Sequence, residues 1–162
     1  MQPSPSPTSA ADPAASPSGG SPPPSRGEPP RIRFIGLSVQ RAGSGRCRAT
    51  VTLEAVDGVR VDGAADVEPS AAGDLRAAAA ATLDALHGAS RTEHRFSLSG
   101  VKSVRAFDQH VVLVQLALAP AGATEPATRL VGSAFAEGDL MRATVLAVLN
   151  ASNRVLWAPT GR

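Results

Sequence analysis

Apolar and polar residues alternate from Cys47 to Val67, and this pattern predicts two adjacent strands. Every second residue of Cys47–Val56 is apolar or small, which is the period of a strand with one buried face. The dipeptide Asp57-Gly58 follows, and it favours a tight hairpin turn because both residue types tolerate positive φ. The alternation resumes over Val59–Val67. We therefore expect an antiparallel hairpin over these residues.

A strand and a helix flank this hairpin in the predicted fold. Arg31–Gln40 is rich in β-branched and large apolar residues, as strands are. After the hairpin, the apolar period becomes that of a helix over Ala71–Leu86. Ser70 is its predicted N-cap, and Gly88 is expected to take the left-handed conformation just after the last turn.

The second half of the chain repeats this order. Phe96–Phe107 predicts a strand interrupted at Gly100, and His110–Ala119 is an almost continuous apolar run. Such a run suits a strand that is covered on both faces. Thr128–Ala136 predicts a third strand, and the helix Gly138–Leu156 follows.

Short sequences recur at matching places in the two halves. Gly63-Ala64-Ala65 and Gly132-Ser133-Ala134 each lie in the strand before a helix. Gly73-Asp74-Leu75 and Gly138-Asp139-Leu140 lie at the two helix starts. The sequence therefore predicts an α+β fold of two βββα repeats, an antiparallel-rich sheet with two helices.

Composition divides the 162 residues into three parts. Ten of the 14 prolines fall in residues 1–30, which we interpret as a disordered Pro/Ser/Ala-rich tail. Residues 31–157 are enough for one α+β domain, and residues 158–162 form a short C-terminal tail. The first 30 residues lack the basic and apolar regions of a secretory signal, so we expect a cytoplasmic protein. No apolar run approaches 18 residues, so no membrane association is expected.

The order of elements resembles the C-terminal regulatory domain of 2-isopropylmalate synthases and citramalate synthases. The similar features are ATVTLE followed by a turn, the Gly-Ala strand end, the Ala-rich helix and the closing Ala143–Arg154. The resemblance covers residues 31–157 and is diffuse. It implies two βββα units related by a pseudo-two-fold axis, a dimer, and a feedback amino acid bound near the interface.

The chain also departs from that family. The synthases carry this domain behind a catalytic barrel, for which 162 residues leave no room. The Gly-Asn-Gly-like turn before the family's helix is replaced by GAADVEPSAAGD. Fold and self-association therefore carry over better than ligand identity.

No residue pattern indicates a catalytic, cofactor or metal site. His87, His94 and His110 are scattered over different elements, without the spacing of a zinc motif. The lone Cys47 excludes an internal disulfide and is expected to be a small buried side chain. We expect no enzyme activity, with a site assembled across a dimer as the alternative.

The two helix starts carry the candidate ligand residues. Asp74 and Asp139 fit the role of carboxylates that complement the helix dipole. The alternative is that paired helix N-termini line a small-ligand cleft. The expected lining residues are Ser70, Gly73, Asp74, Gly138 and Asp139.

Five arginines lie within one 18-residue stretch: Arg31, Arg33, Arg41, Arg46 and Arg48. They suggest a nucleic-acid-binding adaptor as a further alternative. The net charge of only +2 and the absence of interleaved aromatic residues favour a solvated face instead.

The second helix has apolar residues on more than one side, so the other helix or a second subunit must cover part of it. With the apolar run Val111–Leu118, this favours a homodimer. The expected interface residues are Met141, Val145, Val148 and Leu149. We therefore expect a non-catalytic, self-associating regulatory or scaffold module, with a small-ligand site at the repeat or dimer interface.

Overall fold

The computed structural model describes residues 31–70, 72–90, 95–120, 122–123 and 128–156. Its elements are β1 (Arg33–Arg41), β2 (Cys47–Glu54), β3 (Arg60–Val67), α1 (Gly73–Ala89), β4 (Arg95–Ala106), β5 (Gln109–Ala119), β6 (Thr128–Ala136) and α2 (Leu140–Leu156). The predicted α+β fold of two βββα repeats is confirmed. The predicted tails 1–30 and 158–162 and the candidate His94 lie outside the described residues.

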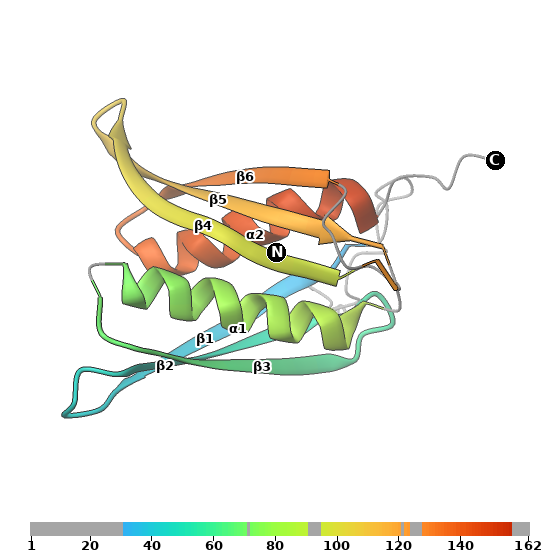
Figure 1. The fold of residues 1–162 in the computed structure, drawn as a ribbon, viewed down its shortest axis with the longest axis horizontal. Helices are drawn as coiled ribbons and strands as arrows, with labels where there is room; N and C mark the ends of the chain where they lie inside the picture. Colours follow the sequence, from blue (N-terminus) through green and yellow to red (C-terminus); the bar gives the residue numbers. More distant parts are fainter. Residues whose placement is uncertain (1–30, 71, 91–94, 121, 124–127, 157–162) are drawn as a thin grey trace, which may run out of the picture.

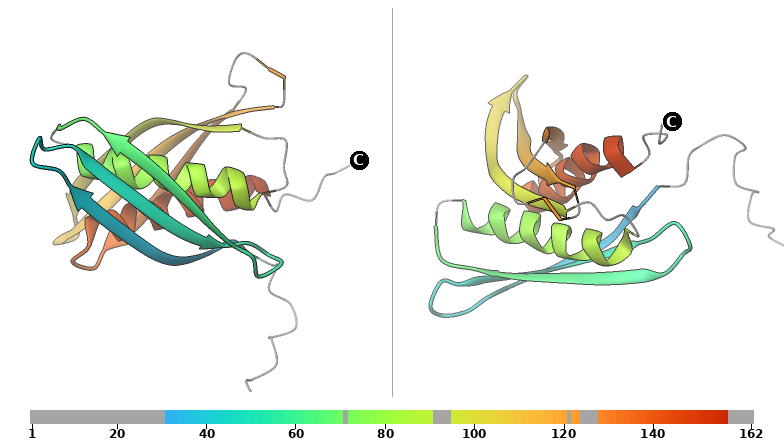
Figure 2. Two further views of the ribbon diagram at one scale, coloured as in Figure 1. Left: turned by 90° about the horizontal axis from the view of Figure 1, so that it is seen from below. Right: turned by 45° about the vertical axis from the view of Figure 1, so that its right-hand side comes forward.

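The strands form two antiparallel sheets, with the orders β1-β2-β3 (sheet 1) and β4-β5-β6 (sheet 2). Helix α1 packs on β2 and β3, and α2 packs on β5 and β6. The helices also pack against each other, so both lie between the two sheets (Figures 1 and 2). Each sheet therefore has an inner face on the helices and an outer face that points away from them.

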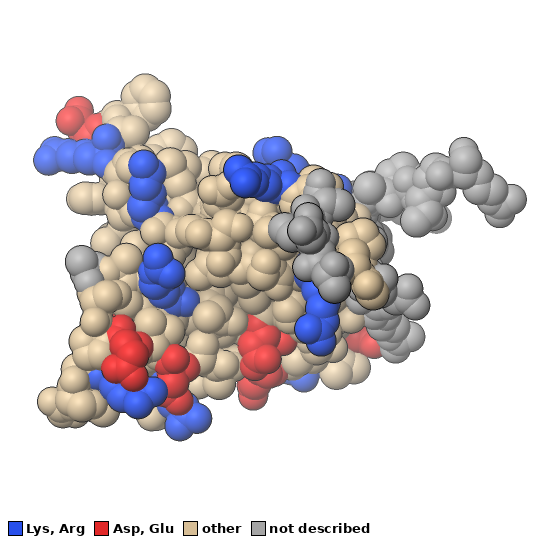
Figure 3. Space-filling model, viewed as in Figure 1, with Lys and Arg blue, Asp and Glu red and all other residues tan. Residues whose placement is uncertain are grey.

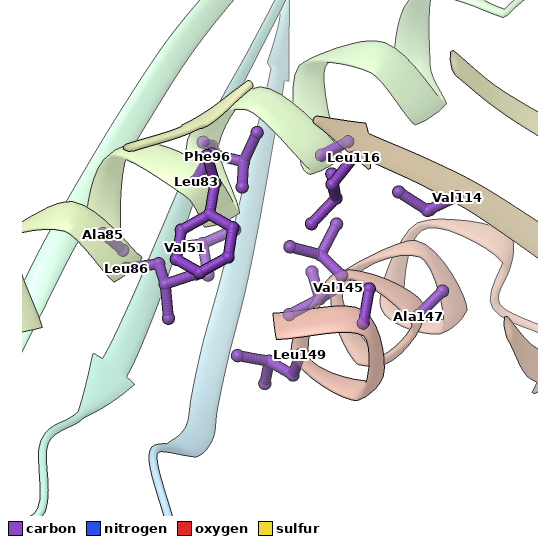
Figure 4. Packing of buried hydrophobic residues seen from close by; sticks show 14 of the residues in the cluster. Val51, Leu83, Ala85, Leu86, Phe96, Val114, Leu116, Val145, Ala147 and Leu149 are labelled. Atoms are coloured by element: carbon purple, nitrogen blue, oxygen red, sulfur yellow. The ribbon is translucent and has the colours of Figure 1, made fainter. Parts of the chain in front are cut away.

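The core forms where both inner faces meet both helices. Val51 and Leu53 of β2, Leu86 of α1, Leu116 of β5 and Val145 of α2 are completely buried. Figure 4 shows Leu83, Leu86 and Phe96 grouped together, with Val145 and Leu149 projecting toward them from α2. The two repeats therefore share one hydrophobic core.

One glycine in each repeat lets a helix lie directly on a strand. A Cβ atom added at Gly63 would lie 2.1 Å from the backbone nitrogen of Ala85. A Cβ atom at Gly132 would lie 2.0 Å from the carbonyl oxygen of Ala147. The predicted match of these two glycines therefore corresponds to the same packing in both repeats.

The first strands of the two repeats share an irregularity at the same place. The register of β1 against β2 shifts between Phe34 and Gly36, and that of β4 against β5 shifts between Leu98 and Gly100. The predicted interruption at Gly100 is thus a bulge within one continuous strand.

The predicted match of Gly73-Asp74-Leu75 with Gly138-Asp139-Leu140 differs by one residue from the match that the helix packing gives. Residues that meet the two glycines, Ala81 and Ala147, are 66 apart, whereas the two Gly-Asp-Leu sequences are 65 apart. Asp139 therefore corresponds to Gly73 in its packing, not to Asp74.

Both predicted ends of α1 are wrong. Ala72, not Ser70, is the N-cap, and no side chain caps the helix there. The carbonyl oxygen of Ser70 accepts a hydrogen bond from the backbone N–H of Gly73, a turn that precedes the helix. Gly88 lies inside the helix, and a Cβ atom there would come within 2.7 Å of a methyl group of Val61. Close packing on β3 explains this glycine.

The turns differ from the predicted hairpin geometry. Gly58 has the expected positive φ of 81°, but Asp57 does not, and the backbone N–H of Ala55 bonds to the carbonyl oxygen of Val59. In the β4–β5 turn the two central residues are Phe107 and Asp108, at φ of 53° and 59°. This turn precedes the predicted position at Asp108-Gln109 by one residue.

Candidate functional site

Asp139 caps α2. Its Oδ1 accepts hydrogen bonds from the backbone N–H groups of Met141 (3.0 Å) and Arg142 (2.9 Å). Gly138, just before it, has a φ of 88° that suits glycine. The carboxylate therefore satisfies backbone donors that the helix start leaves free.

A groove of about 450 Å³ runs beside this cap, between β6 and the first half of α2. Polar and charged side chains along it include Ser133, Glu137, Asp139, Arg142 and Asn150. The groove thus offers groups of both signs around a partly apolar floor formed by Ala143 and Leu146.

Asp74 lies in the first turn of α1 and forms an ion pair with Arg41 at the end of β1. The guanidinium of Arg41 holds the pKa of the Asp74 carboxyl below its usual range. Asp74 also faces the buried Cys47. Burial raises the pKa of the Cys47 thiol most, and the Asp74 carboxylate raises it further. Cys47 is 2% exposed, as the sequence predicts for a small buried side chain, and a protonated thiol is a poor nucleophile.

The two helix starts are not brought into one cleft. The groove at Asp139 has none of Ser70, Gly73 and Asp74 among its lining residues. In Figure 2, left, the first turns of α1 and α2 lie apart although the helices converge further along. Of the five predicted ligand residues, only Asp139 lines this groove.

The predicted interface residues of α2 are used inside the chain. Val145 and Val148 are fully buried and Leu149 is 4% exposed, while Met141 is partly buried against the core. Helix α1 and the two inner sheet faces cover the several apolar sides of α2. The apolar circumference of this helix therefore needs no second subunit.

The outer face of sheet 1 is polar. Charged side chains there form ion pairs between neighbouring strands, such as Arg48–Asp66 (3.6 Å) and Arg33–Glu54 (3.8 Å). The hydroxyl of Thr52 donates to the carboxylate of Asp62. This is the composition expected of a sheet face that meets water.

The outer face of sheet 2 carries an apolar cluster by contrast. Its register places Val104 of β4, Val111 of β5 and Phe135 of β6 side by side, with Leu113 and Val131 further along. Val131 is 57% exposed and Phe135 is 54% exposed. In Figure 3 most of the carboxylates in view lie over the lower half of the molecule, while the upper half shows cations, and a carboxylate at its upper left, among uncharged side chains.

Superposing the two repeats on Gly63 and Gly132 allows the outer faces of the two sheets to be compared position by position. Val131 then occupies the position of Asp62, and Phe135 that of Asp66. The same matching sets Val111 and Leu113 against Arg48 and Thr50. One backbone pattern therefore carries ion pairs between strands in the first repeat and an apolar cluster, with Lys102, Gln115 and Ser133 beside it, in the second.

A shallow depression of about 320 Å³ lies in this apolar face. It sits over Gly100, and its lining includes Lys102, Leu113, Gln115 and Val131. A Cβ atom at Gly100 would meet no atom within 4 Å, so the depression opens where this residue has no side chain.

His87 takes part in packing. Its Nε2 accepts a hydrogen bond of 3.1 Å from the backbone N–H of Phe96, and the two rings stack. Burial lowers the pKa of His87, and Arg95 lowers it further. Nδ1 of His110, in β5, lies 3.4 Å from the hydroxyl oxygen of Ser103 in β4, so the two histidines belong to different parts of the fold. In the part of the chain that the structure describes, no three His, Cys, Asp or Glu residues gather as a metal site would require.

The arginine-rich stretch is largely neutralised by carboxylates. The pairs are Arg33–Glu54, Arg41–Asp74, Arg46–Glu68 and Arg48–Asp66. Guanidinium groups engaged in this way are less free for phosphates. None of the helices within the described ranges has both the length and the apolar character needed to cross a bilayer.

The chain matches no model of a known protein family, and it has no match among curated proteins.

Proposed function

We propose that the chain is a non-catalytic module that associates with a second copy of itself through the outer face of sheet 2. One observation carries the proposal: exposed Val131 and Phe135 stand where the other repeat has Asp62 and Asp66. An exposed apolar sheet face in one repeat, beside a charged one in the other, is typical of an interaction surface.

The size of the face supports a two-copy assembly. Three strands about 4.8 Å apart and roughly 30 Å long give the face a flat area on the order of 400 Å² per copy. The projecting side chains add to the accessible surface of this face. Two such faces with their side chains approach the roughly 1,000 Å² in total that a specific interface needs. A face-to-face pair of sheets would also cover the second side of Val111–Leu118, as the sequence pattern requires.

The regulatory part of the proposal rests on the resemblance to the synthase regulatory domain. Its βββα order is also the order of this chain. The groove beside Asp139 is the proposed ligand site, because Arg142 and Glu137 offer the opposite charges that an amino acid requires. A thermal-shift screen with amino acids tests this part. Arg142→Ala should abolish a stabilising response that Arg154→Ala, at the other end of α2, preserves, and a screen without any response contradicts the ligand site.

The experiment on self-association measures mass by light scattering over a range of micromolar concentrations. Val131→Asp and Phe135→Asp give sheet 2 the residues that sheet 1 has at these positions. Both variants should be monomers with unchanged folds, because the substituted side chains already face away from the core. Ser38→Asp, on the outer face of sheet 1, is the control and should dimerise as the parent does. A monomeric parent chain would refute the proposal.

A further inference from the structure

The β4–β5 turn ends in an exposed aromatic ring. Phe107 is 90% exposed, the largest exposure among the exposed large apolar side chains of the described residues. The turn lies beyond the last β5–β6 pair, His110–Ala136, so it extends past β6 (Figure 1, upper left). The described core makes no use of this ring.

The backbone at Phe107 is unfavourable for phenylalanine. Its φ of 53° belongs to the left-handed region, where a bulky side chain is an outlier and Asn or Gly is the usual choice in such turns. The chain therefore keeps an exposed ring at a position where a smaller polar residue would stabilise the turn. Strain of this kind is a starting point for a functional hypothesis.

The outer face of sheet 2, to which β4 contributes, has a depression that could take an aromatic ring. The site over Gly100 has a volume of about 320 Å³ and is bordered by Leu113 and Val131. Phe107 lies in the turn seven residues after Gly100 of β4, about 23 Å away at 3.3 Å per residue. The ring cannot reach the depression of its own chain, so only another chain could place a Phe107 ring there.

From this we infer that Phe107 of one copy occupies the Gly100 depression of a second copy, and that the exchange is reciprocal. This inference rests on the proposed self-association through the outer face of sheet 2. A two-fold axis across the strands, midway between residues 100 and 107, brings each ring over the partner's depression. That midpoint falls at Ser103 and Val104, and Val104 begins the apolar row that continues through Val111 to Phe135.

Charge supports the same arrangement. Asp108 follows Phe107 in the turn, and Lys102 borders the depression over Gly100. Rotation about the proposed axis brings the carboxylate of each copy toward the ammonium group of the other. The ring provides an aromatic anchor in an apolar site, and the ion pair fixes its orientation.

Two variants and one matched control test the inference by analytical ultracentrifugation of the full chain. Phe107→Asn should raise the dimer dissociation constant at least tenfold while leaving the monomer as stable as the parent or more so, since Asn suits positive φ. Gly100→Val should weaken the dimer to a similar degree because it fills the depression. Gly36→Val, at the corresponding bulge of sheet 1, also meets open space and should leave dimerisation unchanged.

A double variant distinguishes a direct contact between Phe107 and Gly100 from independent effects of the two substitutions on the dimer. Because Phe107 and Gly100 would touch across the interface, Phe107→Asn with Gly100→Val should weaken the dimer less than the two single effects combined. A dimer that is lost with Val131→Asp but unaffected by Phe107→Asn and Gly100→Val would overturn the reciprocal insertion and leave self-association in place. A parent chain that stays monomeric would overturn both.

Discussion

His87 Nε2 accepts a hydrogen bond from the backbone N–H of Phe96, and this bond joins the end of α1 to the start of β4. It thereby connects the helix of the first repeat to the first strand of the second. Only a ring with an unprotonated Nε2 can accept this bond. The lowered pKa of His87, caused mainly by burial, agrees with a neutral ring in the folded protein.

We expect this linkage to make stability depend on pH. Because the folded-state pKa of His87 lies below its unfolded value of 6.5, the unfolded chain binds the proton more readily. The stability from the neutral ring is fully present above pH 6.5 and falls as the pH drops below that value, until the folded ring is protonated too. Urea unfolding between about pH 5 and 7.5 measures this loss. His87→Gln, which keeps an acceptor but does not titrate, should flatten the dependence.

The control for this titration is His110→Gln, because His110 is exposed and has no comparable burial. It should follow the parent over the same pH range. A pH dependence that is identical in the parent and in His87→Gln would contradict the role given to this histidine.

A second prediction concerns the contact between α1 and β3. Gly63→Ala would place a Cβ atom 2.1 Å from the backbone nitrogen of Ala85, which forces the helix away from the strand. We expect a loss of about 2–3 kcal/mol or more, the range of severe overpacking. Gly36→Ala meets open space and should change the free energy of unfolding by less than about 0.5 kcal/mol. Equal stabilities of the two variants would show that the helix is not held against this glycine.

The sequence predicts the parts of this fold that depend on local periodicity. The alternation over Cys47–Val67 identifies the buried residues of β2 because only one face of that strand packs on a helix. The observed bounds of β6 match the predicted range Thr128–Ala136. The positive φ of Gly58 agrees with the Asp-Gly turn predicted between two alternating stretches.

The features that were mispredicted depend on contacts between distant elements. Ser70 has the chemistry of an N-cap, but the turn that its carbonyl forms with Gly73 delays the helix. Gly88 resembles a helix end, and its contact with Val61 is invisible along the sequence. The several apolar sides of α2 indicate two covering surfaces, yet the pattern cannot say whether these belong to the same chain.

The sequence contains the apolar residues of the outer face of sheet 2, but their periodicity does not show which face of the strand they lie on. Val131 and Phe135 alternate with small residues that face the helix, so apolar residues lie on both sides of β6. The register, which only the structure supplies, shows that these two residues stand where the first repeat has aspartates.

A third prediction concerns the β2–β3 turn. Gly58 has a φ of 81°, and a Cβ there would meet no other atom, so Gly58→Ala tests backbone strain without a steric clash. We expect a loss of about 1 kcal/mol in the free energy of unfolding. Gly43→Ala, in a loop position that is also open and lacks positive φ, should cost less. Thermal unfolding distinguishes the two variants, and identical melting temperatures would argue against strain at Gly58.

A fourth prediction follows from the free edges of the two sheets. Asp84 of α1 accepts a hydrogen bond of 3.0 Å from the backbone N–H of Ala64 in β3. Asn150 of α2 donates one of 2.9 Å to the carbonyl oxygen of Ser133 in β6. The two helix residues occupy matching positions, but one binds a donor and the other an acceptor. Each occupies an edge group that could otherwise pair with a strand of another molecule.

Because of this difference, we expect the fold to tolerate Asp84→Asn but not Asn150→Asp. Asp84→Asn retains a carbonyl oxygen that can accept from Ala64, so it should cost less than Asp84→Ala, which loses about 1 kcal/mol. Asn150→Asp cannot donate to Ser133 and places a carboxylate against a carbonyl oxygen, so it should cost more than Asn150→Ala. Urea unfolding gives the order of stabilities, and light scattering after heating reports pairing at the exposed edges. If Asn150→Asp were as stable as the parent chain, the bond to Ser133 would not protect this edge, and β6 would be free to add a strand.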